Sequence, residues 1–399
     1  MNCANTIAAP YHSPTKASIM CTHPIFIKNP NLGLKDKGMG FMKDTVSRYI
    51  AIPCRHCPEC YANMQMQLVQ RVQMECLEQH CFFCTLTYND ESLPVIHLPR
   101  LDGQPGSIPI RFADVLDVQN MIKRLRNRDA FGRPFRYLAV SELGSKRARP
   151  HFHILFFVRK LDSDDYNDCL NLERTLHRAV IQEWRRNYSD NWRRPDYRPL
   201  CTYVSKWTRK GLSTTFDLHW CNPRLTDSGV ADVGFYVTKY MTKPCDRTRR
   251  LQQALHLNLE PDEYERIWSV VKPRYFASLG FGVNPEIDPK SGRIISCSKV
   301  IVDYLKSCVN RSIGVYKSPR FINPVDGSSF PLSRYYYNFP EIYSFMDSLS
   351  FWFMDPDPDP DNIVHDDRIR DVIIRKEKVF QERTSKLIRS NYFDFDSLF

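Results

Sequence analysis

The fold of this chain is decided by the stretch Arg149-Pro150-His151-Phe152-His153-Ile154-Leu155-Phe156-Phe157-Val158. The run is short and rich in Phe, Ile and Val, so it predicts a β-strand. Alternate residues of a strand share a face, which places His151 and His153 side by side. Both faces become apolar beyond them, as in a central strand covered on both sides. The two imidazoles could hold one metal ion or be structural histidines satisfied by neighbours, and the pair alone favours neither.

The composition limits the classes of protein to consider. The chain has 399 residues, 14 cysteines and a formal net charge of +11. This length suits two or three domains, and the positive charge favours nucleic acid as a partner before a membrane surface. The cysteines are dispersed and no signal peptide is recognisable, which indicates a reducing cytosol. No segment approaches the roughly 18 apolar residues of a transmembrane helix, so we expect a soluble protein.

A carboxylate is expected beside the two histidines. Residues 135–140 predict a second strand, which Ser141-Glu142-Leu143-Gly144 closes before the chain returns to His151. This spacing is typical of a hairpin, so Glu142 ends one strand where the histidines begin the next. Two histidines and one carboxylate suit a divalent ion that keeps open coordination positions. The combination favours a metal site over two structural histidines.

Candidate contacts to a polyanion lie close to these strands. A strand predicted at residues 81–88 places two threonine hydroxyls on one face, where they could meet a phosphate or simply pack at a sheet surface. The loop of the predicted hairpin is basic. The candidate DNA-contact residues are Thr85, Thr87, Lys146, Arg147 and Arg149.

A second informative stretch runs from Val233 to Pro244 and predicts a helix that the proline ends. Tyr236 and Tyr240 are four residues apart, and Lys239 and Lys243 follow each tyrosine by three. All four side chains therefore lie on one stripe of the helix. A solvated polar face would give the same pattern, so the stripe alone does not decide between a catalytic and a structural role.

Three cysteines precede the first predicted helix, at Cys54, Cys57 and Cys60. A Cys-x-x-Cys turn presents two thiolates to one tetrahedral ion, and structural zinc takes four ligands. No second Cys-x-x-Cys stands at zinc-ribbon spacing to complete the set. Structural zinc and free cysteines in a tight turn that caps the following helix are equally compatible with this pattern.

The remaining pattern alternates helices with strands. Residues 91–112 are expected to be loop, with Asp114 as the N-cap of the helix that follows. Helices are predicted at 61–80, 114–128, 164–188, 296–309 and 363–390, a strand at 213–220, a helix and turn up to Trp268, strand-and-loop structure at 313–345, and a stiff Asp/Pro linker at 355–361.

These parts together suit nucleophilic attack by a tyrosine on a phosphodiester. A phenol has a pKa near 10 and is a weak nucleophile until a base or cation favours the phenolate. Glu142, His151 and His153 would hold the divalent ion that polarises the phosphate. Tyr236 or Tyr240 would attack, and the two lysines would offset the developing negative charge. A covalent phosphotyrosine keeps the energy of the cleaved link and permits later rejoining, and two tyrosines permit two successive transfers.

The order of these motifs resembles the replication initiators of the Microviridae, phages with small circular single-stranded DNA. Those proteins belong to the rolling-circle endonucleases named for a His-hydrophobic-His motif. The resemblance rests on Thr85-Leu86-Thr87-Tyr88, Glu142, the His-x-His and the stretch Tyr236 to Lys243. The cysteine cluster and Ser333-Arg334-Tyr335-Tyr336 resemble the gokushovirus-like branch. The motifs cover residues 54–243, and Ser141 stands where Gly is frequent.

The resemblance implies an α+β fold with a central antiparallel sheet of about five strands flanked by helices. A Cys-rich N-terminal element and a helical C-terminal extension are expected around it. It implies Mg²⁺ or Mn²⁺ at the metal set, and nicking of phage origin DNA in the cytoplasm of a bacterial host. A 5′-phosphotyrosine, a 3′-hydroxyl extended by the host polymerase, and rejoining of the displaced strand would follow. The expected parts are an N-terminal arm and Cys-rich turn (1–60), a nicking domain (61–250), an accessory region (251–354), a linker (355–362) and a helical tail (363–399).

Two rivals remain open at this point. In the first, a non-enzymatic protein binds zinc and nucleic acid, and its His-x-His is structural. In the second, the chain is a relaxase or transposase of the same superfamily that acts on another DNA. No Gly-x-x-x-x-Gly-Lys-Ser/Thr motif occurs, so strand separation is expected to fall to a host helicase, and no membrane partner is expected.

Overall fold

The structure is a computed structural model that describes residues 25–28, 49–54, 58–99, 106–144, 149–191, 193–201, 216–221, 246–313, 320–322 and 329–349. The chain divides into two compact units. One comprises Met1–Met64 and Leu305–Arg389, and the other comprises Gln65–Tyr304 and Ser390–Phe399. The candidate metal ligands lie in the second unit. The domain boundaries expected from the sequence remain predictions.

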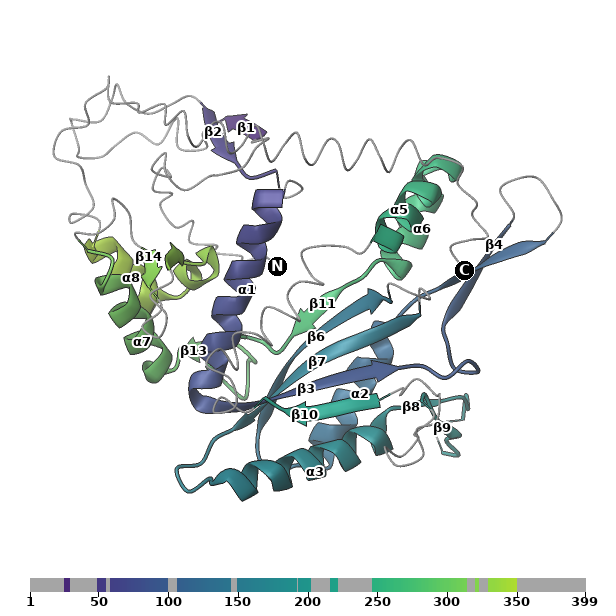
Figure 1. The fold of residues 1–399 in the computed structure, drawn as a ribbon, viewed down its shortest axis with the longest axis horizontal. Helices are drawn as coiled ribbons and strands as arrows, with labels where there is room; N and C mark the ends of the chain where they lie inside the picture. Colours follow the sequence, from purple (N-terminus) through teal and green to yellow (C-terminus); the bar gives the residue numbers. More distant parts are fainter. Residues whose placement is uncertain are drawn as a thin grey trace. The chain divides into compact units, whose positions relative to one another are not determined.

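The larger unit contains a five-stranded antiparallel sheet with the order β10-β3-β7-β6-β11 (Figure 1). The His-x-His strand β7 is its centre, and each of its neighbours is also a long apolar strand. The predicted α+β class is therefore confirmed. The bounds are β10 Phe216–Trp220, β3 Gln79–Thr87, β7 Pro150–Arg159, β6 Phe135–Leu143 and β11 Tyr275–Ala277.

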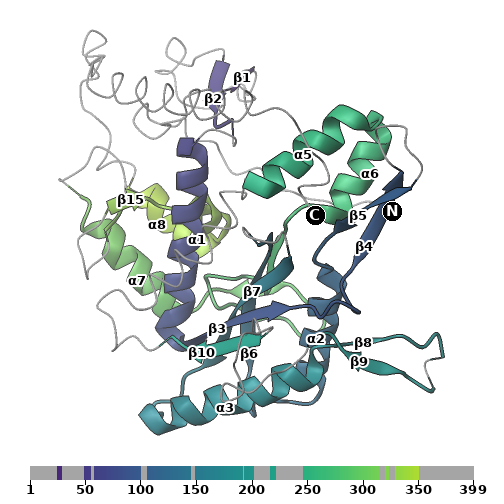
Figure 2. The same cartoon turned by 45° about the vertical axis from the view of Figure 1, so that its right-hand side comes forward.

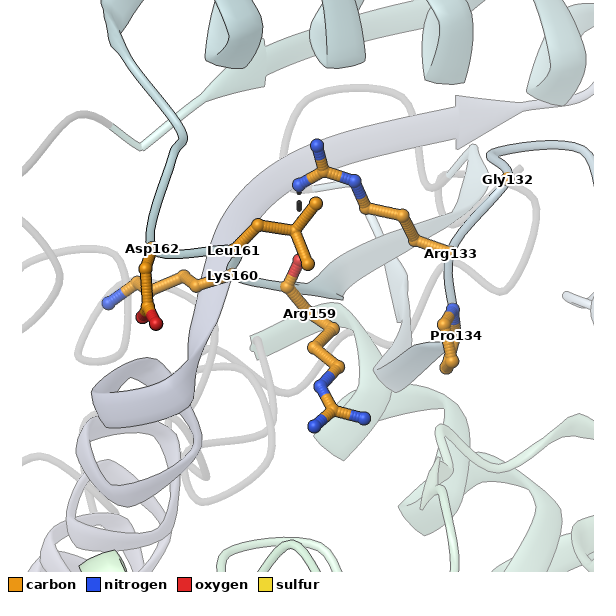
Figure 3. A pocket seen from close by; sticks show the side chains of 7 residues that line it. All are labelled: Gly132, Arg133, Pro134, Arg159, Lys160, Leu161 and Asp162. Atoms are coloured by element: carbon orange, nitrogen blue, oxygen red, sulfur yellow. Dashed lines mark hydrogen bonds between the residues drawn. The ribbon is translucent and has the colours of Figure 1, made fainter.

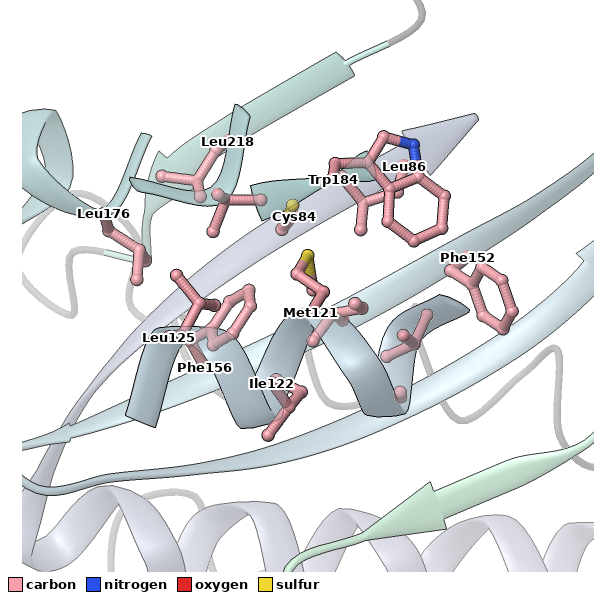
Figure 4. Close-up of a cluster of buried hydrophobic side chains, with 14 of the residues drawn as sticks. Cys84, Leu86, Met121, Ile122, Leu125, Phe152, Phe156, Leu176, Trp184 and Leu218 are labelled. Carbon is pink, nitrogen blue, oxygen red and sulfur yellow. The ribbon is translucent and has the colours of Figure 1, made fainter. Parts of the chain in front are cut away.

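Two helices cover one face of the sheet and bury its main core (Figure 4). Helix α2, Val115–Asn127, begins at Asp114, whose side chain accepts a hydrogen bond from the backbone N–H of Leu116. Helix α3, Tyr166–Glu183, begins with a capping box formed by Asp165 and Asp168. Such caps satisfy backbone donors that have no partner inside the helix. Met121, Ile122 and Leu125 of α2 meet Phe152 and Phe156 of β7 in this core.

The opposite face of the sheet is covered by the end of α1, Pro58–Glu78, and by the loop after β11. Val72 and Phe281 pack there against Leu155 and Phe157. A buried carboxylate ties these layers together, since Glu75 forms an ion pair with Arg136 at 3.0 Å and accepts a hydrogen bond from the N–H of Gly282 at 2.7 Å. Burial raises the pKa of Glu75 despite the neighbouring guanidinium.

A hairpin and two helices gather at the end of the sheet where β6 stops (Figures 1 and 2). Strands β4, Val95–Pro99, and β5, Ser107–Arg111, pair where the sequence predicted only loop, so that expectation was wrong. Helices α5, Asp246–Asn258, and α6, Pro261–Val271, pack with this hairpin and with Leu143 in one buried cluster. The cluster supplies the long-range apolar contacts that a Pro- and Gly-rich hairpin lacks in its own sequence.

A second hairpin follows α3. Strands β8, Arg185–Asn187, and β9, Tyr197–Pro199, form an arm that extends away from the sheet (Figure 2). The helix expected up to residue 188 therefore ends at Glu183. It ends there because the buried Trp184 turns away from the helix and its indole N–H donates to the carbonyl of Thr87 at 2.9 Å.

The other described elements are short. Contrary to the strand-and-loop structure expected at 313–345, a 3₁₀ helix and an α-helix follow the strands there. The 355–362 linker and the 363–399 helical tail lie outside the described residues. No helix in the described ranges is long and apolar enough to span a membrane. The elements are β1 Ile25–Lys28, β2 Tyr49–Ile52, β12 Glu286–Ile287, β13 Ile294–Ser296, α7 Lys299–Asn310, β14 Arg320–Ile322, β15 Ser329–Pro331, η2 Arg334–Asn338 and α8 Pro340–Leu349.

Candidate metal centre

Three strands bring the candidate ligands together through their register. His151 on β7 lies directly opposite Glu142 on β6 and Thr87 on β3. His153, two residues further along β7, lies opposite Thr85. Residues that face each other in an antiparallel ladder point to the same side of the sheet, with Cβ atoms about 5 Å apart. The predicted hairpin from Glu142 to His151 is thus present, with both histidines on one face.

The ligand atoms of Glu142, His151 and His153 all lie within 4.8 Å of one another. His151 Nε2 is 3.2 Å from Glu142 Oε1 and 3.2 Å from His153 Nε2. Metal–ligand bonds of about 2.1 Å place neighbouring ligand atoms roughly 3.0–3.4 Å apart. Both measured separations fall in that range.

The hydrogen bonds of the two rings favour a cation at this point. His151 Nδ1 lies 3.1 Å from the carbonyl oxygen of Arg149, and a carbonyl only accepts, so Nδ1 carries the proton. In the neutral ring, Nε2 of His151 is then an acceptor that faces an acceptor oxygen of Glu142. The second carboxylate oxygen, Oε2 of Glu142, is buried without a hydrogen-bond partner among the described residues. These groups lack positive charge between them, which a divalent ion would supply.

His153 is held as a neutral imidazole. Burial, with a smaller contribution from His151, lowers the pKa of His153 to about 3. Its Nδ1 lies 3.2 Å from Oγ1 of Thr85, and its ring stacks on Phe83 with centroids 5.4 Å apart. A metal ligand must be deprotonated at its coordinating nitrogen, and a fixed partner on the other nitrogen orients the ring. The protein therefore holds His153 ready to bind a cation.

The other predicted site residues are only partly described. Arg149, predicted to contact DNA, instead donates to the carbonyl of Tyr88 and forms a 2.6 Å ion pair with the exposed Asp90. It closes the end of β3 against β7, and DNA contact by Arg149 remains a prediction. Thr85 and Thr87 lie in the histidine rows of the sheet. The predicted residues Lys146, Arg147, Tyr236, Lys239, Tyr240 and Lys243 lie outside the described residues.

The chain that follows the tyrosines is anchored beside the candidate ligands. Helix α5 begins at Asp246, six residues after Tyr240. Its buried Leu251 and Leu255 pack in one cluster with Leu143, the residue that follows Glu142 on β6. The tyrosine segment thus leads directly into a helix that is fixed at the metal end of the sheet.

The cysteine cluster is described in part. The sulfurs of Cys54 and Cys60 lie 3.9 Å apart, and Cys57 falls outside the described residues. Two thiolates on one tetrahedral zinc are separated by roughly 3.8 Å, from bonds of about 2.3 Å. The predicted zinc site remains a prediction that this spacing permits.

Sequence reasoning missed two polar residues on the strand next to the site. Asp217 on β10 lies opposite Thr85, and His219 lies opposite Phe83, so both share the face of His153. Their side chains are half-exposed and 4.0 Å apart. The alternation of polar and apolar residues in Phe216–Trp220 is the signal that could have placed them on this face.

A separate pocket opens at the far end of β7 and is unrelated to the candidate ligands. It has a volume of about 430 Å³ and lies around Arg159, the last residue of β7 (Figure 3). Eight strand steps, roughly 26 Å, separate Arg159 from His151. Its cations do not converge on one point, because Arg133 pairs with Asp164 while Lys160 donates to the carbonyl of Cys76. The pocket is lined by Gly132, Arg133, Pro134, Arg159, Lys160, Leu161 and Asp162.

Comparison with known proteins identifies the domain that carries the site. Residues 81–245 match the family described as replication-associated protein ORF2. This segment belongs to that family. The replication-associated domain begins at β3 and includes the whole His-x-His strand, Glu142, and the stretch with both candidate tyrosines.

Two viral proteins are similar to the replication-associated domain. The replication-associated protein ORF2 of Spiroplasma virus 4 is 30% identical over 176 residues, which are 41% of this chain and 50% of that protein. The replication-associated protein VP4 of Bdellovibrio phage phiMH2K is 33% identical over 114 residues, 27% of this chain and 31% of that protein. The matches thus span half or less of each relative. They confirm the resemblance to replication initiators of small single-stranded DNA phages. No solved structure matches the chain.

Proposed function

We propose that this chain is a rolling-circle replication initiator that nicks and rejoins phage origin DNA through a covalent phosphotyrosine. The observation that carries the proposal is the set of Glu142, His151 and His153 on one face of the central sheet, within 4.8 Å of one another. The set lies inside a domain of a replication-associated family. Its donor chemistry, one carboxylate and two imidazoles, suits a divalent ion with open positions.

Mg²⁺ or Mn²⁺ bound to Glu142, His151 and His153 would polarise the scissile phosphate and offset its negative charge. The protein's own part is to hold these ligands in place. The carbonyl of Arg149 and the hydroxyl of Thr85 fix the outer nitrogens of the two rings, as the distances of 3.1 and 3.2 Å indicate. Phe83 covers His153 and keeps water from one side of the ring.

Tyr236 or Tyr240 acts as the nucleophile in this proposal. The phenol oxygen bonds to phosphorus and loses its proton, while the bond from phosphorus to the 3′ oxygen breaks and that oxygen gains a proton. The products are a 5′-phosphotyrosine and a free 3′-hydroxyl. Lys239 and Lys243 offset the charge of the phenolate and phosphate. Attack by a 3′-hydroxyl on the phosphotyrosine reverses the step and rejoins the strand.

The proposed partners follow from this chemistry. Single-stranded or supercoiled origin DNA is the substrate, the host polymerase extends the 3′-hydroxyl, and a host helicase separates the strands in the bacterial cytoplasm. The net charge of +11 favours such a polyanionic substrate. Zinc at Cys54, Cys57 and Cys60 would be structural and would stand apart from the reaction.

The decisive experiment incubates the full chain with single-stranded origin DNA and Mn²⁺, and assays for an SDS-stable protein–DNA complex. The wild type should form the complex, and Tyr236→Phe/Tyr240→Phe together should abolish it. The single variants show which tyrosines act. An adduct that survives the double change would overturn the assignment of the nucleophile.

The metal set has its own test in the same assay. Glu142→Ala and His153→Ala should lose Mn²⁺-dependent cleavage while origin binding persists. Unchanged cleavage in either variant removes that residue from the set. A non-enzymatic DNA-binding protein would bind in a salt-sensitive manner and cleave under no metal. A relaxase or transposase of the same superfamily would form the adduct on a different DNA.

A further inference from the structure

We propose that the β8–β9 arm, residues 185–199, binds the unpaired DNA strand next to the nicking site. The inference rests on the proposed function for the identity of the substrate, but its observations are independent of the metal ligands. The arm carries five arginines, two aspartates and two described tyrosines in a short hairpin. Arginines beside aromatic rings suit the stacking of bases and the neutralisation of phosphates in single strands.

The tyrosine rings of the arm are exposed rather than buried in a core. Tyr188 is 40% exposed and Tyr197 is 42% exposed. The guanidinium of Arg198 lies 5.1 Å from the ring centroid of Tyr188, and that of Arg185 lies 4.4 Å from the ring centroid of Tyr197. Each ring is thus held by an arginine and still offers two-fifths of its surface to solvent. A base that stacks on such a ring would meet a cation beside it.

The loop of the arm adds positive charge. Arg193 and Arg194 are exposed near its tip, and the side chain of Arg198 is 64% exposed. Arg198 shares its charge with Asp196 at 2.7 Å, which leaves the arm with a net positive charge of three from its five arginines and two aspartates. This charge complements a DNA backbone.

The root of the arm is fixed to the strand that borders the candidate metal centre. The indole N–H of Trp184 donates to the carbonyl of Thr87 at 2.9 Å, and Thr87 lies opposite His151 in the sheet. On the other strand of the arm, Leu200 donates to the carbonyl of Trp184 and accepts from the N–H of Asn89 at 2.7 Å. The arm therefore begins at the same end of the sheet as the metal ligands.

A buried ion pair fixes the direction of the arm. Arg186 donates two hydrogen bonds to Asp117, at 2.9 and 2.5 Å, and Asp117 also accepts from the hydroxyl of the buried Tyr88. Charged hydrogen bonds in a buried place are strong and geometrically specific. A strand bound along the arm would run from the metal centre outward over roughly 20 Å, from six residues at about 3.3 Å each.

The test measures binding of the full chain without metal, so that it does not depend on nicking. The probes are a fluorescent 30-nucleotide single strand of mixed sequence and the duplex of the same sequence. The test variant is Tyr188→Ala/Tyr197→Ala, and Tyr188→Phe/Tyr197→Phe retains the rings. The matched control is Tyr166→Ala, which removes a tyrosine that is 49% exposed at the other end of α3.

The double alanine variant should bind the single strand at least about fivefold more weakly than the wild type, because base stacking is lost. The phenylalanine variant and Tyr166→Ala should bind as the wild type does. The duplex affinity should change by less than the single-strand affinity. Unaltered melting temperatures and circular dichroism show that the variants are folded.

Two outcomes overturn the proposal. Wild-type affinity of the double alanine variant for the single strand would show that the rings do not stack on bases. An equal loss for single strand and duplex would assign the arm to a duplex groove, which also admits a two-stranded ribbon. Photocrosslinking with 5-iododeoxyuridine in the single strand, followed by mass spectrometry, should locate the linkage at Tyr188 or Tyr197. Loss of the covalent adduct with intact arm binding would contradict the proposed function and leave this inference standing.

Discussion

His151 and Glu142 face each other across the β6–β7 ladder, with His151 Nε2 3.2 Å from Glu142 Oε1. The imidazole cannot donate from this nitrogen while its Nδ1 proton is given to the carbonyl of Arg149. Two acceptors are therefore held together beside a third at His153. The sheet accepts this local repulsion because long apolar strands fix the register on both sides.

A first prediction concerns the gain in stability from metal. With Mn²⁺ at about 100 times its dissociation constant, the free energy of unfolding of the wild type should rise by about 2.7 kcal/mol. Glu142→Gln should lose most of this gain because a charged ligand is removed. Without metal the variant should be no less stable than the wild type, since Oε2 of Glu142 is buried without a described partner. Denaturant titrations with Mn²⁺ and with EDTA test both statements, and an equal metal gain in the two proteins would contradict the ligand set.

A second prediction concerns the hydroxyl behind His153. Thr85→Val keeps the shape of the side chain but removes the oxygen 3.2 Å from His153 Nδ1. Partners of this kind typically change metal affinity by about 10–100-fold, so we expect at least a tenfold loss of Mn²⁺ affinity by calorimetry. Thr85→Ser retains the hydroxyl and should bind Mn²⁺ as the wild type does. Equal affinities of the valine and serine variants would show that the hydroxyl does not orient the ring.

A third prediction compares two glycines in left-handed backbone. Gly282 has φ +94°, and an added Cβ would lie 2.8 Å from Cβ and 3.1 Å from Cα of Arg71. Gly292 has φ +66° and would meet nothing within 4 Å. Gly292→Ala should cost about 1–2 kcal/mol from backbone strain alone. Gly282→Ala should cost roughly 1–3 kcal/mol more, because the α1 backbone cannot move aside. Urea denaturation of both variants measures the difference, and equal costs would show that the contact with Arg71 relaxes freely.

A fourth prediction concerns acid stability far from the metal centre. Asp164 accepts hydrogen bonds from Arg133 at 2.6 and 2.8 Å and from His80 at 3.0 Å. These contacts, Arg133 first, hold the pKa of Asp164 well below its usual range. The folded protein therefore binds this proton later than the unfolded chain. Its stabilising contribution is complete above the unfolded pKa of about 3.9 and is lost as the pH falls toward the folded pKa.

This contribution changes by at most about 1.4 kcal/mol per pH unit for one proton. Asp164→Asn should therefore lower the free energy of unfolding at pH 7 and flatten its fall between pH 4 and pH 2. Asp162→Asn, at an exposed aspartate two residues away, should keep the wild-type slope. The same acid slope in wild type and Asp164→Asn would remove this carboxylate from the acid response.

Local sequence signals were sufficient for the central elements of the fold. The N-cap at Asp114, the hairpin from Glu142 to His151 and the shared face of His151 and His153 were all predicted, and the structure has them. Each depends on a short-range rule, namely a capping side chain, a turn spacing or the two-residue period of a strand. The proximity of the three candidate ligands follows from the same rules.

The missed features depend on contacts between distant residues. The end of α3 at Glu183 is set by the bond from Trp184 to Thr87, almost a hundred residues earlier, and no helical period reveals it. The fifth strand, β11, has only three residues and exists because β6 offers it an edge. The roles of the Arg149 carbonyl and the Thr85 hydroxyl likewise appear only when three strands are aligned.

The contact of Asp117 with both Tyr88 and Arg186 has a consequence for where the DNA would be cut. One side chain locks the arm and the end of β3 into a single rigid piece. A strand held by such a piece is measured as by a ruler, because the gripped bases and the metal ligands keep a constant separation. The cleaved position would then be counted in nucleotides from the gripped segment, and Asp117 would set the zero of that scale.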